Sequence, residues 1–179
     1  MLNIMKTMKI IITKSPEETI KLAGKVADKL NPGDFISLIG DLGTGKTVFV
    51  KGLAKALKVE DYLYVNSPTF VIVKEYKGKM DLFHFDVYRL DIKSFCETLD
   101  YEKYFYGKGV TVVEWADKIQ EVLPEEYVEV VLEHKEEDQR LIVIRGVGAR
   151  YEKIADNIDW REGTGNRRQG TGDREQRRT

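Results

Sequence analysis

Residues 40–47 constrain this chain more than any other segment, because their sequence GDLGTGKT fits the pattern G-x-x-x-x-G-K-[S/T]. In that pattern backbone amides surround the phosphates of a nucleotide, while the lysine and the hydroxyl serve the phosphates and a metal ion. The short apolar run before it, residues 34–39, has no helical period and predicts a strand buried on both faces. Apolar residues at helical spacing follow in residues 48–57. Strand, glycine-rich loop and helix together predict nucleotide binding, because the first amides of such a helix point unpaired toward the phosphates.

The loop supplies most of the residues expected to hold the nucleotide. Lys46 is expected to reach the outer phosphates, and Thr47 to ligate magnesium directly. Gly40 and Gly45 are expected to bring the backbone close to phosphate without a clashing Cβ. The predicted nucleotide-binding residues of the loop are Asp41, Leu42, Gly43, Thr44, Gly45, Lys46 and Thr47.

The chain length of 179 residues suits one domain with a single sizeable core. The formal net charge is only −1, but the last 19 residues hold six arginines against three acidic side chains and no apolar one. Such a composition cannot bury a core. We therefore predict one nucleotide-hydrolysing domain in residues 1–160 and a disordered basic tail in residues 161–179.

The single cysteine, Cys96, excludes an internal disulfide, and no apolar run approaches the roughly 18 residues that would span a bilayer. The first residues lack the features of a signal peptide, and Met5 and Met8 are alternative starts. These features predict a cytoplasmic protein with no membrane segment. Cys96, with no base within sequence reach, is expected to be a small buried hydrophobe.

The remaining elements predict a mixed sheet. Ser15, Pro16 and Glu18 form a capping-box signature at the start of a helix that runs to about Leu30. Two apolar runs around residues 77–79 suggest an antiparallel hairpin. Together these elements favour an α/β fold like that of P-loop NTPases, a three-layer sandwich with a mixed parallel and antiparallel central sheet. The expected strands are residues 9–13, 34–39, 70–76, 81–86, 110–115, 127–134 and 139–145, and the further helices are residues 92–99, 101–106 and 151–160.

Two carboxylates end apolar strands and are candidates for catalysis and for metal binding. Glu114 follows four β-branched residues and is expected at the carboxyl edge of the sheet, where open α/β sheets bind ligands. It could hold a metal-bound water or accept a proton from the attacking one, although a solvated strand-end glutamate gives the same pattern. Asp86 is the second metal candidate, because a buried carboxylate is easier to explain beside magnesium than without a partner. An aspartate that caps the next turn is the alternative.

Two further side chains, Trp115 and Thr69, each have two interpretations, and His84 has one. Trp115 is either a core residue or an aromatic of the nucleotide pocket. Thr69 could contact the γ-phosphate or its magnesium as a switch, or it could satisfy backbone amides in a turn fixed by Pro68. His84 is expected to be a hydrogen-bonded core residue and not a catalytic one, because no cysteine or second histidine lies at metal-ligand spacing.

Four ordered motifs, residues 40–47, 67–70, 84–90 and 114–118, resemble the bacterial TsaE family, over about residues 11–145. The resemblance implies an ATPase that supports synthesis of N6-threonylcarbamoyladenosine beside the anticodon of tRNAs that read codons beginning with A. It implies two protein partners, TsaD, which carries out the transfer, and TsaB. The implied roles are phosphate and Mg²⁺ binding for Lys46 and Thr47, a switch for Thr69, metal or water carboxylates for Asp86 and Glu114, and a nucleotide-site aromatic for Trp115.

Other functions use the same loop. Kinases that act on phosphorylated acceptors gather several arginines, whereas here only Arg89 precedes Arg140. The chain lacks an Asn/Thr-Lys-x-Asp element after a later strand, so we expect ATP and not GTP. A nucleotide-gated binding module that does not hydrolyse ATP fits the same residues. We expect a weak ATPase that partners activate, with weak contact between the basic tail and tRNA phosphates as a further possibility.

Overall fold

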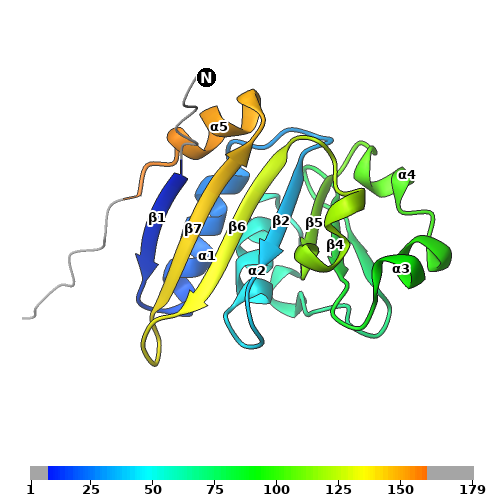
Figure 1. Cartoon of the computed structure of the whole chain (residues 1–179). Helices are drawn as coiled ribbons and strands as arrows, with labels where there is room; N and C mark the ends of the chain where they lie inside the picture. Colours follow the sequence, from blue (N-terminus) through cyan, green and yellow to red (C-terminus); the bar gives the residue numbers. More distant parts are fainter. Residues whose placement is uncertain (1–7, 161–179) are drawn as a thin grey trace, which may run out of the picture.

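The computed structural model describes residues 8–160, which form one seven-stranded sheet with helices packed against it (Figure 1). The strand order is β1-β7-β6-β2-β5-β4-β3. The predicted tail, residues 161–179, and the alternative start Met5 lie outside the described residues. The strands are β1 Met8–Thr13, β2 Phe35–Ile39, β3 Val73–Tyr76, β4 Leu82–Asp86, β5 Val110–Glu114, β6 Tyr127–His134 and β7 Arg140–Val147.

The sheet is mixed, as the sequence predicts. Its centre is parallel, because β2 pairs in parallel with both β5 and β6, and β4 pairs in parallel with β5. Its margins are antiparallel, since β3 pairs with β4, β7 with β6, and β1 with β7. The carboxyl ends of β2, β5 and β4 therefore meet at one edge, where α/β sheets commonly bind ligands.

Helices cover both faces and give the predicted three layers. On one face α1 and α2 pack against the central strands, and on the other α3, α4 and η2 cover β2, β5 and β4 (Figure 1). The last helix, α5, packs against β7. The helices are α1 Pro16–Ala27, α2 Lys46–Ala56, η1 Tyr62–Tyr64, α3 Ile92–Thr98, α4 Glu102–Phe105, η2 Ala116–Val122 and α5 Ala149–Asp156.

Alternation along each strand divides the core into two clusters. Ile36 and Val112 point into the cluster with α1 and α2, whereas Phe35 and Val113 point into the aromatic-rich cluster on the opposite face. All four side chains are buried. Burial on both faces explains why these strands read as continuous apolar runs in the sequence.

The start of α1 follows its capping signature. The Ser15 hydroxyl accepts a hydrogen bond from the Glu18 amide at 3.3 Å, and Pro16 occupies the first turn. The Glu18 carboxylate reaches back to the amide of Lys14 at 2.8 Å. The helix ends at Ala27, slightly earlier than predicted.

Two local predictions are wrong. The strand expected from residue 70 begins at Val73, because the amides of Val71 and Ile72 both donate to the carbonyl of Pro68, at 2.9 and 2.7 Å. This turn ends the preceding loop and keeps both amides out of the ladder, while the Ile72 carbonyl accepts a hydrogen bond from the Asp86 amide of β4 at 2.9 Å. Cys96 is exposed and not buried, since its neighbour Phe95 takes the inward position of the short helix α3.

A polar cluster joins α5 to the residue before β2. The Asp34 carboxylate accepts hydrogen bonds from both terminal nitrogens of Arg150, from the Tyr151 hydroxyl at 2.9 Å and from the Asn31 amide at 2.7 Å. Burial raises the pKa of Tyr151 to about 12, and the charge on Asp34 adds to the shift. The cluster ties the last described helix to the amino end of β2, away from the loop. None of the helices between residues 8 and 160 has the length and apolar character needed to cross a bilayer.

Candidate functional site

The phosphate-loop segment links β2 to α2, which begins at Lys46. Gly45 caps this helix with a φ of 99°, a conformation that favours glycine. Gly40 has a φ of 147°, and a Cβ added there would lie 2.3 Å from the carbonyl oxygen of Leu132 on β6. The close neighbour of Gly40 is therefore the adjacent strand, a reason for glycine that the sequence pattern did not reveal.

Lys46 is buried at the centre of the site. Its Nζ donates to the carbonyl oxygens of Gly40 at 2.7 Å and Asp41 at 2.8 Å, and it lies 3.8 Å from the centroid of the Trp115 ring. Burial lowers the pKa of Lys46, and nearby carboxylates, above all that of Glu114, oppose this shift. The ammonium group is thus held by acceptors of the loop and by an aromatic face.

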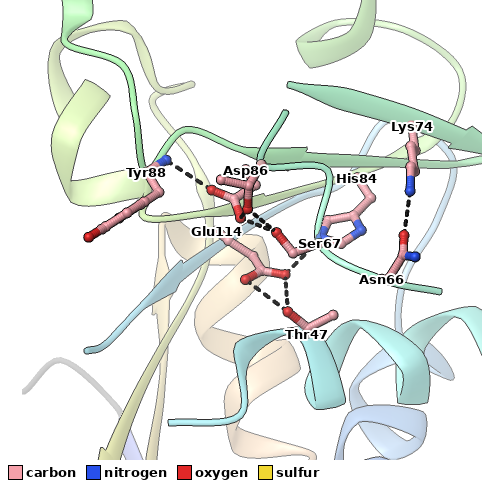
Figure 2. Close-up of polar contacts among 9 residues, drawn as sticks. Thr47, Asn66, Ser67, Lys74, His84, Asp86, Tyr88 and Glu114 are labelled. Carbon is pink, nitrogen blue, oxygen red and sulfur yellow. Dashed lines mark hydrogen bonds and ion pairs between the residues drawn. The ribbon is translucent and has the colours of Figure 1, made fainter. Parts of the chain in front are cut away.

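Glu114, at the end of β5, contacts both the first turn of α2 and the neighbouring strand β4. The Thr47 hydroxyl donates to Oε1 at 2.8 Å, with Oε2 at 3.2 Å, and His84 Nε2 lies 2.8 Å from Oε1 (Figure 2). Glu114 is buried, with only 3% of its surface exposed. A solvated strand-end glutamate, the alternative suggested by the sequence, is therefore wrong.

Asp86 ends β4 directly beside Glu114, its register partner on β5. Its Oδ2 accepts hydrogen bonds from the hydroxyls of Ser67 and, at 2.7 Å, of Thr69, and its Oδ1 accepts one from the Tyr88 amide at 2.9 Å (Figure 2). Asp86 therefore caps the turn after β4 and also anchors the loop before β3. The Thr69 hydroxyl contacts a carboxylate, not the backbone amides of its own turn.

Trp115 adopts a left-handed backbone conformation, with a φ of 63°. Such a conformation is strained for a bulky residue and concentrates at functional sites. Its amide donates to the carbonyl of Leu38 at 3.0 Å, and its ring lies 4.8 Å from that of Tyr88. The ring lines the pocket and is partly exposed, so it is more than a core residue.

One pocket of about 510 Å³ brings most of the predicted site residues together. Pockets of about 620 and 730 Å³ lie elsewhere, but neither includes a residue of the loop. Two of the predicted residues do not line it: the Thr44 hydroxyl donates to the carbonyl of Asp41 at 2.9 Å, and Asp41 does not reach the pocket wall. The lining residues are Leu42, Gly43, Gly45, Lys46, Thr47, Val48, Ser67, Thr69, Phe70, Asp86, Tyr88, Arg89, Glu114 and Trp115.

Two side chains without a predicted site role contact the candidate carboxylates. His84 was expected to be hydrogen-bonded in the core, which it is, but its partner is the candidate carboxylate Glu114. The period of two along β4 places His84 on the same side as Asp86, and this was the signal that could have identified it. Ser67 begins the motif of residues 67–70 but has no predicted role of its own, and its hydroxyl donates to Asp86.

The donor set of the pocket suits a hard cation that is shared with phosphates. Among residues 8–160, no three His, Cys, Asp or Glu side chains form a cage that could hold a metal ion by themselves. Magnesium at phosphate sites usually takes only one or two carboxylates and completes its shell with water and substrate oxygens. Thr47, Glu114 and Asp86 offer oxygen ligands of this kind at adjoining positions.

Comparisons with known proteins agree on one family. The family model "Threonylcarbamoyl adenosine biosynthesis protein TsaE" matches residues 13–142. The tRNA threonylcarbamoyladenosine biosynthesis protein TsaE of Bacillus subtilis is 45% identical over 147 residues, covering 82% of this chain and 90% of that protein. The protein of the same name from Aquifex aeolicus is 45% identical over 117 residues, covering 64% and 81%. A crystal structure of Bacillus subtilis YdiB superposes with a TM-score of 0.72 at 39% identity, covering 86% of this chain and 95% of that one.

Proposed function

This chain belongs to the TsaE family of threonylcarbamoyl adenosine biosynthesis proteins, and we propose that it is the subunit that binds and hydrolyses ATP in that pathway. Proteins of this family take part in tRNA threonylcarbamoyladenosine biosynthesis. The modification it would support is N6-threonylcarbamoyladenosine, at the adenosine beside the anticodon of tRNAs that read codons beginning with A. One observation carries the proposal: Lys46 and Thr47 of the loop share a pocket with two strand-end carboxylates.

In this proposal the loop and the start of α2 bind the phosphates of ATP. The unpaired amides at the amino end of α2 and its dipole favour the negative charge there. Lys46, now held by two carbonyl oxygens and the Trp115 ring, would exchange these partners for the outer phosphates. The proposed nucleotide-binding residues are Asp41, Leu42, Gly43, Thr44, Gly45, Lys46, Thr47, Thr69 and Trp115.

Thr47, Glu114 and Asp86 are the proposed magnesium-site residues. Magnesium, when bound, neutralises charge on the β- and γ-phosphates. Glu114 contacts the loop hydroxyl at 2.8 Å, so we propose that it serves either the ion itself or a water molecule bound to the ion. Asp86 lies one strand further and holds Thr69, so we propose that it couples the loop before β3 to the γ-phosphate end of the site.

Three side chains would act on the reaction itself. Lys46 would stabilise the charge on the departing phosphoryl group, and Glu114 or Asp86 would orient the attacking water. Variants Glu114→Gln and Asp86→Asn separate the two carboxylates. The one that holds the metal should raise the Mg²⁺ concentration needed for half-maximal turnover, and the one that orients water should lower kcat at saturating Mg²⁺.

We propose TsaD and TsaB as the protein partners. The apolar side chains at the mouth of the pocket support a partner there, since Phe70 is 83% and Leu42 77% exposed. Among residues 8–160, Arg89 is the one arginine that lines the pocket, and its guanidinium lies 4.5 Å from the centroid of the Phe70 ring. A partner that covers Phe70 would therefore act directly on Arg89. We propose that turnover is slow in the chain alone and faster in the complex for this reason. Weak contact with tRNA phosphates through residues 161–179 is a further part of the proposal.

Two other functions use the same pocket. A kinase for phosphorylated acceptors needs several arginines, but Arg140, the other candidate, donates through Nε to the Thr44 carbonyl at 3.1 Å and lies outside the pocket lining. A nucleotide-gated binding module would bind ATP without turnover. The carboxylate pair beside Thr47 favours hydrolysis over that module, since a purely binding site needs no residue to orient water.

A reconstituted modification reaction tests the proposed pathway role. Purified TsaD and TsaB, tRNA and an activated threonylcarbamoyl donor are incubated with ATP and either this chain, its Lys46→Ala variant or no addition. Mass spectrometry of digested tRNA measures N6-threonylcarbamoyladenosine. We expect repeated turnover only with the unmodified chain. Equal yields with the Lys46→Ala variant would contradict a role for ATP binding by this protein.

A further inference from the structure

We infer that His84 is a positioning residue for Glu114: its Nε2–H bond fixes the carboxylate in the geometry that the site needs. The effect on rate rests on the ATP hydrolysis proposed above, whereas the contact itself rests on geometry alone. His84 is therefore assigned to the site and not merely to the core.

The contact is short and fully enclosed. His84 is 0% exposed, and its Nε2 lies 2.8 Å from Glu114 Oε1 (Figure 2). The two residues lie on neighbouring parallel strands, where His84 is the register partner of Val112. Since His84 is paired with β5 on one side and, through Lys74, with β3 on the other, its backbone is fixed from both sides.

The other ring nitrogen decides the direction of this bond. His84 Nδ1 is buried and finds no hydrogen-bond partner among the residues that the structure describes. A neutral imidazole carries its proton on one nitrogen and accepts through the other. A proton on Nδ1 would leave a buried N–H group unpaired, which is costly. The proton therefore lies on Nε2, and His84 donates to Glu114.

Thr47 and His84 share the same carboxylate oxygen but differ in what else they do. Thr47 is the loop hydroxyl that would ligate magnesium in the proposed function, so its bond to Glu114 is exchangeable. The ring nitrogens of His84 have no other partner in residues 8–160. When the Thr47 hydroxyl turns to another ligand, His84 remains as the donor that holds the carboxylate.

Outer partners of this kind typically change metal affinity or activity by roughly 10–100-fold when they are removed. We expect the His84→Leu variant, which keeps the bulk of the side chain but loses the donor, to lower kcat by about that factor. The His84→Gln variant places an amide nitrogen near the position of Nε2 and should recover most of the rate. Nucleotide affinity should change little in both variants, because neither removes a proposed phosphate contact.

A double-mutant cycle distinguishes positioning from a general structural role. The single variants His84→Leu and Glu114→Gln, and the double variant, are compared in kcat, in ATP affinity by calorimetry and in melting temperature. If His84 acts through Glu114, the double variant should be no slower than Glu114→Gln alone. Multiplying effects, or a His84→Leu variant as fast as the unmodified chain, would overturn the inference.

Nitrogen NMR tests the contact without any turnover. The chain has two histidines, so a His134→Gln variant assigns both imidazole spectra. We expect His84 to carry its proton on Nε2, with a shift of this signal in the Glu114→Gln variant. A proton on Nδ1, or a signal that Glu114→Gln leaves unchanged, would overturn the inference. If the unmodified chain hydrolyses no ATP, the proposed function fails, and the NMR result alone decides the role of His84.

Discussion

The Thr47 hydroxyl donates to Glu114 Oε1 at 2.8 Å, which joins the first turn of the loop helix to the end of a strand 67 residues further along the chain. This contact exists because β5 pairs directly with β2, the strand that leads into the loop. It places a carboxylate beside the hydroxyl expected to ligate magnesium. The arrangement makes Glu114 the residue whose replacement is most informative.

The Glu114→Gln variant should bind ATP nearly as well as the unmodified chain but hydrolyse it roughly 100-fold or more slowly, the range expected for loss of a catalytic carboxylate. The amide keeps the shape and hydrogen-bonding capacity but loses the charge. Calorimetric binding and single-turnover hydrolysis measure the two quantities. Glu133→Gln, at an exposed position of β6, is the control. Unchanged hydrolysis in Glu114→Gln would remove Glu114 from the mechanism.

Trp115 should report nucleotide binding by fluorescence. Its ring lies 3.8 Å from Lys46 Nζ, so transfer of this ammonium to phosphate changes the environment of the indole. A Trp160→Phe variant leaves Trp115 as the single tryptophan. The emission of Trp115 in this variant should change saturably as ATP is added. In the double variant Trp160→Phe/Lys46→Ala, ATP should leave the emission unchanged. Calorimetric binding of ATP with constant emission would show that Lys46 does not leave the ring.

Gly40→Ala should destabilise the protein by about 2–3 kcal/mol, the upper range for overpacking. The new Cβ would lie 2.3 Å from the Leu132 carbonyl oxygen, at a φ that disfavours side chains. The matched control is Gly24→Ala in α1, where the new Cβ meets only Ala56 at 3.9 Å. That change should stabilise the helix by about 0.5–1 kcal/mol. Urea unfolding measures the free energy of unfolding of both variants. A Gly40→Ala variant as stable as the unmodified chain would contradict the close approach of Gly40 to Leu132.

The raised pKa of Tyr151 should make the protein less stable at alkaline pH. This pKa is raised to about 12 in the folded protein, from 10.0, so the folded state retains a proton that the unfolded chain loses. This stabilising contribution is fully present below about pH 10 and is lost as the pH rises through about 12. The slope of unfolding free energy against pH should therefore be steeper for the unmodified chain than for Tyr151→Phe in this window.

Urea unfolding between pH 9 and about pH 11 gives these slopes. Tyr106→Phe, at an exposed tyrosine, is the control and should keep the slope of the unmodified chain. Identical slopes in all three proteins would mean that the Tyr151 hydroxyl is not held in its neutral form by burial beside Asp34.

Local signals predicted most of the fold. The capping residues of α1 and the glycine-rich loop before α2 act over a few neighbouring positions, so their pattern is visible in the sequence. The meeting of Asp86 with Glu114 was also predictable in outline, because the carboxyl ends of parallel strands share an edge.

Contacts between distant segments were not predictable in this way. The bond between His84 and Glu114 depends on which strands are neighbours, and the cluster of Asp34 with Arg150 joins positions 116 residues apart. β3 starts late because two backbone amides donate to the carbonyl of Pro68, and no residue pattern in the sequence predicts these hydrogen bonds. The exposure of Cys96 was also not predictable, because the short helix α3 buries Phe95 and only the packed structure shows which side of the helix faces the core.

The most direct test of the central claim is magnesium-dependent ATP hydrolysis by the purified chain, alone and with TsaD and TsaB, with the Lys46→Ala variant as background. We expect slow hydrolysis by the chain alone and clear stimulation by the pair, since the described residues give the pocket two carboxylates but a single arginine, Arg89. Fast hydrolysis without the pair, or none under either condition, would contradict an ATPase subunit that its partners activate.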